Sequence, residues 1–134
     1  MSKFRARSLL LPLIVAFGLT ACGGDSASSG VVLTADGELG RKVARGNGCA
    51  ACHGANGEGT VGPAFVGLYG STVTFDDGST TMADDAYLRE SILEPSARRV
   101  EGFNLPMPEN DLSDEQVEQL IAYIRDLSAP VSAP

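Results

Sequence analysis

The most regular spacing of apolar positions lies near the end of the chain. Ser113 and Gln116 have the types and the spacing of a helix capping box, with Leu112 and Val117 placed as a hydrophobic staple around the first turn. The apolar positions that follow recur every three or four residues, as on one face of an amphipathic helix. They are Val117, Leu120, Ile121, Ile124 and Leu127. The pattern predicts a helix that begins just after Ser113.

Two further helices are predicted earlier in the chain. The first runs over about 35–45, with Thr34 as its N-cap and Gly46 at its end, and we expect Leu39 and Val43 to share one face. The second spans about 84–93. Its residues at helical spacing are Tyr87, Leu88, Ser91 and Ile92, and Pro95 follows its end.

The segments between the helices are predicted to be loops. Residues 54–72 are rich in glycine and indicate irregular structure, while 73–81 could form a small hairpin around Asp77-Gly78. With 134 residues, no Trp and 16 Gly, the chain suits a single small domain with long loops. The fold class predicted is therefore a small all-α domain with three main helices.

The N-terminus has the pattern of an export signal. Three basic residues precede an apolar stretch over 9–18 that is too short to span a bilayer. The stretch ends in Leu-Thr-Ala before Cys22, which resembles a bacterial lipobox. We therefore expect residues 1–21 to be a lipoprotein signal peptide and 22–34 to be a lipidated Cys22 with a flexible tether. An ordinary secretion signal is the alternative, and either one predicts an exported protein.

The charge of the expected mature chain narrows the possible partners. Removing residues 1–21 takes away three of the ten basic residues and none of the 17 acidic ones, which leaves a net charge of −10. A surface this acidic is a poor partner for nucleic acid. The domain itself is expected over 35–128, with 129–134 as a flexible tail.

The segment Cys49-Ala-Ala-Cys52-His53 carries the chemistry. Two thiols three positions apart can each form a thioether to one of two vinyl groups of a haem, and the following imidazole then lies beneath the iron. A thioredoxin-like pair would need a βαβ context, which the sequence lacks. A zinc site would need more ligands, and the chain has only this one His. The motif predicts one covalently bound haem c with His53 as an axial ligand.

A second axial ligand is expected from later in the chain. The internal candidates are Met82 and Met107. Met107 lies between Pro106 and Pro108 in a segment ahead of the last helix, and prolines stiffen a loop that must present a weak thioether at a fixed distance. A methionine is more often core filler than a ligand. We nevertheless favour Met107 as the ligand and expect Met82 only to pack.

The order of these features resembles class I cytochromes c, over about residues 35–128. Within that class the sequence resembles the cytochrome c domain fused to subunit II of some bacterial haem–copper oxidases. The stretches that carry this resemblance are 62–63, 73–78, 87–95 and 102–108. The resemblance implies a cytochrome c fold in which the Pro63 carbonyl accepts a hydrogen bond from the axial His53. It also implies a close helix crossing at Gly40 and Tyr123.

The sequence departs from oxidase subunit II in what it lacks. That subunit has transmembrane helices and a dinuclear copper site built from Cys and His, whereas this sequence has no spare Cys or His and no hydrophobic span after the predicted signal. We expect the cytochrome domain alone, tethered by lipid and facing the periplasm or the cell exterior.

These features predict an electron-transfer protein and not an enzyme. With His53 and Met107 both on the iron, no position is left for a small-molecule substrate. We expect a one-electron carrier of a respiratory chain, with a redox protein as donor and a terminal oxidase or similar acceptor. The expected contact patch is Ala50, Ala51, Phe65 and the Met107 loop, around the exposed haem edge.

Two other functions remain open from the sequence. An open or displaceable distal position would make the protein a peroxidase-like enzyme or a gas sensor. Alternatively, a lipid-anchored haem protein could be a fixed subunit of a larger membrane complex.

Overall fold

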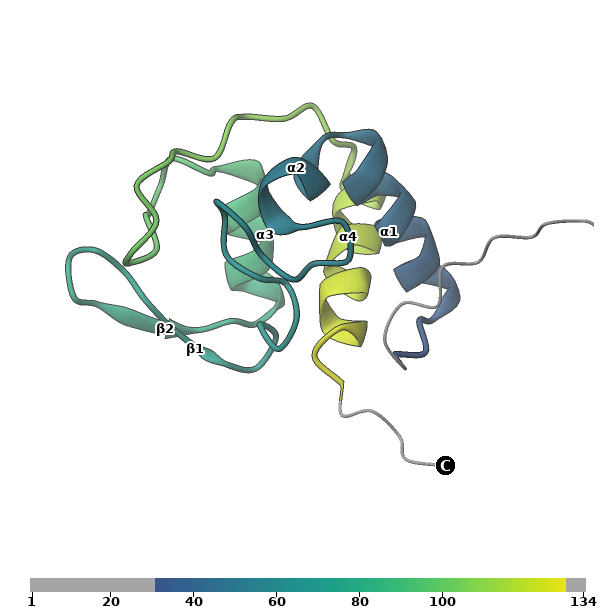
Figure 1. Cartoon of the computed structure of the whole chain (residues 1–134), viewed down its shortest axis with the longest axis horizontal. Coiled ribbons are helices and arrows are strands. Elements are labelled where there is room, and N and C mark those ends of the chain that lie inside the picture. The colour runs from purple at the N-terminus through teal and green to yellow at the C-terminus, as the bar shows by residue number, and fades with distance from the viewer. Residues whose placement is uncertain (1–30, 130–134) are drawn as a thin grey trace, which may run out of the picture.

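The computed structural model describes residues 31–129 of the chain (Figure 1). Its helices are α1 (Ala35–Gly46), α2 (Cys49–His53), α3 (Asp85–Leu93) and α4 (Asp114–Asp126), and its strands are β1 (Thr72–Thr74) and β2 (Thr80–Met82). The predicted signal peptide, Cys22 and residues 130–134 of the predicted tail lie outside the described residues. The all-α class is confirmed. The short helix α2, which carries the C-x-x-C-H motif, adds to the three predicted helices.

Helix α4 occupies the centre of the domain. It packs against both α1 and α3, and α1 also contacts α2 (Figure 1). The apolar stripe predicted for this helix is fully buried, from Val117 to Leu127. Its first turn has the predicted capping box, in which the Ser113 hydroxyl and the Gln116 side chain each accept the other residue's backbone N–H. Local sequence therefore specifies both where this helix begins and which face it buries.

Helices α1 and α4 cross so closely that only a glycine fits at their contact. A Cβ built on Gly40 would lie 1.9 Å from the Gln119 carbonyl oxygen and 2.8 Å from Tyr123 Cβ. The contact between Gly40 and Tyr123 that the resemblance implied is thus present. Leu39 and Val43 lie one turn apart on this helix, as predicted, but Leu39 is 41% exposed whereas Val43 is buried. The buried face of α1 is made of Gly37, Gly40, Val43 and Ala44, since the close approach leaves no room for a larger residue.

The beginning of α1 is attached to the end of α4. The backbone N–H and the hydroxyl of Thr34 both donate to Asp126 Oδ2, at 2.7 and 2.8 Å, while the same hydroxyl caps α1 by accepting from Gly37. Val31 and Leu33 already pack against the core. Packing contacts therefore begin ahead of residue 35, where the domain was expected to start.

The predicted hairpin is confirmed, and a third segment lies beside it. Strands β1 and β2 pair antiparallel, with Val73 opposite Thr81. Phe75 then forms an isolated antiparallel bridge with Val100. This bridge fixes the start of the long loop that connects α3 to α4, which runs across the top of the view in Figure 1.

Candidate haem centre

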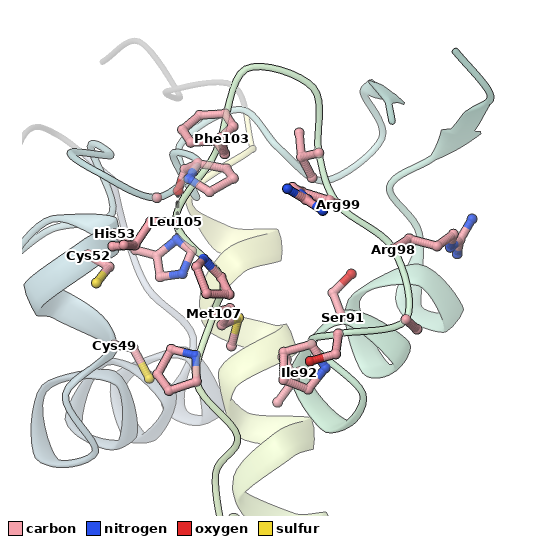
Figure 2. Close-up of a pocket in the computed structure, with 18 of the residues that line it drawn as sticks. Cys49, Cys52, His53, Ser91, Ile92, Arg98, Arg99, Phe103, Leu105 and Met107 are labelled. Atoms are coloured by element: carbon pink, nitrogen blue, oxygen red, sulfur yellow. Dashed lines mark hydrogen bonds between the residues drawn. The ribbon is translucent and has the colours of Figure 1, made fainter. Parts of the chain in front are cut away.

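The short helix α2 brings the three motif residues to one side. Gly48 precedes it with a φ of 80°, a left-handed conformation that favours glycine and turns the chain sharply out of α1. Cys49, Cys52 and His53 stand at positions i, i+3 and i+4 of the helix, which share one face. Figure 2 shows this face turned towards a cavity, with both sulfur atoms on the same side of it. Both thiols are free and half-buried.

The His53 ring is held from two directions. Its Nδ1–H donates to the Pro63 carbonyl at 2.7 Å, which leaves Nε2 as the free nitrogen. Phe65 stacks on the ring, with centroids 4.4 Å apart and planes 16° apart. Gly62 closes the third side, since a Cβ there would lie 3.1 Å from His53 Cε1. The hydrogen bond implied for Pro63 is therefore present in the structure, and it orients the imidazole as a metal ligand needs.

Burial sets the protonation of the motif. It lowers the pKa of His53, and the opposing hydrogen bond to Pro63 only partly offsets this. A neutral imidazole with a free Nε2 is the form that binds iron. Burial also raises the pKa of the Cys49 thiol. Burial thus favours the neutral forms of His53 and Cys49, as suits a site inside an apolar cavity.

The cavity beside α2 has a volume of about 750 Å³, within the range of roughly 300–1,000 Å³ that is typical of ligand pockets. Its walls come from α2, α3, α4, the loop between α3 and α4, and the segments 61–68 and 75–77. Most of the lining is apolar, including Leu68, Phe75, Leu88, Ile92, Phe103, Leu120 and Ile124. An apolar cavity with two thiols and a neutral imidazole at one wall fits a covalently bound haem: Cys49 and Cys52 would hold it, and the iron supplies one-electron chemistry.

The two candidate methionines differ in their position relative to the cavity. Met107 lines the cavity that His53 also lines, on the loop between α3 and α4 (Figure 2). Met82 ends strand β2, is 62% exposed and takes no part in the lining. Of the two candidates, only Met107 is therefore placed to reach a haem in this cavity. Met82 is also too exposed to be the packing residue that was expected.

The expected contact patch needs one correction. Phe65 is buried, because its ring is committed to stacking on His53. The large exposed apolar residues that line the cavity are Val61, 54% exposed, and Leu105 of the expected Met107 loop, 61% exposed. Neither belongs to a periodic pattern in the sequence, so only the fold shows that both line the same cavity.

Comparison with known proteins agrees with this geometry. The sequence model of the cytochrome c family matches residues 37–128, which is more than half of the chain. No curated protein matches the chain. The matched segment contains most of α1, all of α2, α3 and α4, the C-x-x-C-H motif and the Met107 loop. The chain therefore belongs to the cytochrome c family, whose members carry covalently bound haem c and transfer electrons.

Proposed function

We propose that this cytochrome is a lipid-anchored one-electron carrier of a respiratory chain, which donates to a terminal oxidase or a similar acceptor. The observation that best supports a relay is the presence of Met107 and His53 in the walls of one cavity. Two protein ligands on the iron leave no position for a substrate. Cys49 and Cys52 would form the thioethers, and Pro63 would hold the His53 ring.

The opening of the cavity supports brief contact with a protein partner. Val61 and Leu105 are exposed there, next to the loop that carries Met107. A small apolar contact area of this kind suits the weak complexes of electron transfer, which bury less than about 1,200 Å². The partners proposed are therefore redox proteins that dock on this face.

Membrane attachment is proposed through Cys22, from its lipobox-like context. Among the described residues, no helix is long and apolar enough to cross a membrane. Changing Cys22 to Ser should move the holoprotein from the membrane fraction to the soluble exported fraction with its haem intact. Unchanged partitioning of Cys22→Ser into membranes would contradict a lipid anchor.

The relay is tested on the purified holoprotein. We expect ferric protein to resist cyanide and ferrous protein to resist carbon monoxide, because Met107 holds the distal position. We also expect membranes that contain a terminal oxidase to oxidise the ferrous protein in a reaction that an oxidase inhibitor stops. Rapid binding of either ligand would favour the enzyme or sensor function instead. Failure of oxidation would contradict the proposed acceptor.

A further inference from the structure

The loop that follows the haem motif is hydrogen-bonded back onto the end of α2. The last carbonyls of a helix have no donor within it and need partners from elsewhere. The Cys52 carbonyl accepts from the Thr60 hydroxyl at 2.7 Å, from Gly62 N–H at 2.9 Å and from Thr60 N–H at 3.2 Å. Gly59 N–H donates to the next carbonyl, that of His53, at 2.7 Å. This stretch of loop is therefore held against the backbone of the motif.

The same stretch also reaches the imidazole of the motif. It continues directly into Pro63, whose carbonyl accepts from His53 Nδ1–H at 2.7 Å. Gly62 lies between the two contacts, and a Cβ there would lie 3.2 Å from both the Cys52 carbonyl oxygen and His53 Nδ1. The loop thus contacts the backbone and the ring of the motif within a few residues, so a shift at one contact must shift the other.

Thr60 makes the side-chain contribution to this attachment. Among the described residues of the loop 54–64, it is the only one whose side chain bonds to α2. Its hydroxyl makes the shortest of the three bonds to the Cys52 carbonyl, whereas its N–H is shared with the Gly62 carbonyl at 3.3 Å. Thr60 is exposed and takes no part in the cavity lining within residues 31–129. Its hydroxyl can therefore influence a haem only through the backbone that it holds.

We propose that the Thr60 hydroxyl is a positioning group for the axial histidine, because it keeps the Pro63 carbonyl within hydrogen-bonding distance of His53 Nδ1–H. A hydrogen bond at Nδ1 raises the basicity of a metal-bound imidazole. A more basic ligand stabilises ferric iron, and hydrogen bonding around the ligands is one of the factors that set the potential of a haem. Thr60 therefore lowers the reduction potential without contacting the cofactor. The inference rests on His53 as a ligand of haem c and not on the proposed respiratory role.

The test removes the hydroxyl and keeps the shape of the side chain. Thr60→Val replaces the hydroxyl by a methyl group, and Thr60→Ser keeps the hydroxyl. Thr80→Val is the matched control, since it makes the same replacement at an exposed position of β2, outside the cavity wall. Because the chain has one histidine, isotope-labelled histidine in the full holoprotein reports on the His53 ring alone by nuclear magnetic resonance.

In ferrous Thr60→Val, we expect the His53 Nδ1 proton to exchange with solvent about threefold to tenfold faster, as for the loss of one hydrogen bond. The reduction potential should rise by about twofold in the equilibrium with a reference couple, or about 18 mV. Thr60→Ser and Thr80→Val should keep both quantities at their wild-type values. A purely structural role for Thr60 would lower the unfolding midpoint and leave the potential unchanged.

Unchanged proton exchange or an unchanged potential in Thr60→Val would overturn the assignment, and so would equal changes in Thr80→Val. Should Thr60→Val not accumulate with haem, the comparison of Thr60→Ala with Thr60→Ser decides, since both shorten the side chain and only the second keeps the hydroxyl. We expect only Thr60→Ala to speed the exchange and raise the potential. Identical values in these two variants would show that the hydroxyl does not position the imidazole.

Discussion

Replacing Gly40 by Ala tests whether the crossing of α1 and α4 holds this fold together. The added Cβ would lie 1.9 Å from the Gln119 carbonyl oxygen and 2.6 Å from its carbon. Ordinary contact begins near 3.4 Å, so these atoms must separate by about 1.5 Å. Both obstacles are backbone atoms inside a helix, and no rotamer change can relieve them. The helices themselves must move apart.

The cost follows from what that separation disturbs. Overpacking a well-formed contact costs typically 1–3 kcal/mol, and moving two central helices belongs at the upper end of that range. We expect Gly40→Ala to lower the free energy of unfolding by about 3 kcal/mol, a large share of the roughly 5–15 kcal/mol of a typical domain. Because α2 follows α1 directly, the haem motif should shift as well.

Gly46→Ala is the matched control on the same helix. A Cβ at Gly46 meets nothing within 4 Å. There the substitution should stabilise the protein by about 0.5 kcal/mol, because alanine loses less backbone entropy than glycine in a helix. Guanidinium unfolding of the holoproteins, followed by circular dichroism and by haem absorbance, measures both changes. A Gly40→Ala protein within about 0.5 kcal/mol of the wild type would refute the crossing as described.

Further substitutions test the haem centre. Met107→Ala should open a coordination position, lower the reduction potential and let carbon monoxide or cyanide bind, as redox titration and absorption spectra would show. Met82→Ala should leave the potential and the ligand binding unchanged. The reverse result for the two variants would contradict the choice of Met107 as the ligand. Cys49→Ser should leave the haem on a single thioether or lost, visible by haem staining after denaturing electrophoresis. Wild-type protein that releases its haem to acid–acetone would contradict covalent attachment altogether.

The parts of the fold predicted correctly from sequence are those governed by local rules. Helix α4 begins directly after its N-cap Ser113 and buries the predicted stripe, because a capping box and a 3.6-residue period act within one segment. The hairpin likewise follows its turn at Asp77-Gly78. The burial of Gly37 and Gly40 could not be predicted in this way, because helical periodicity says which residues share a face but not how near the neighbouring helix comes. That distance is set by glycines on α1 meeting α4.

In the candidate site, too, local features were predicted from sequence and contacts between distant segments were not. The C-x-x-C-H motif and the choice of Met107 over Met82 came from spacing and proline stiffness, and the cavity contains both predicted ligands. The contact of Phe65 could not be predicted from sequence, because stacking on His53 depends on how the 11 residues 54–64 return to the motif. Arg98 and Arg99 are neighbours of one type, and only the structure shows that Arg98 pairs with Glu90 whereas Arg99 pairs with Asp76.

The helix crossing and the haem ligand are connected by a short path of aromatic rings. Tyr123, which faces Gly40, meets the edge of Phe65 at 6.5 Å and 84°, and Phe65 stacks on His53. The Pro63 carbonyl fixes the same imidazole by hydrogen bonding. An electron carrier works best when its ligands keep their geometry in both oxidation states, which requires rigid support behind them. The tight packing of α1 on α4 therefore supports the haem ligand as well as the fold, because it fixes the Tyr123 and Phe65 rings, and Phe65 in turn fixes the His53 ring.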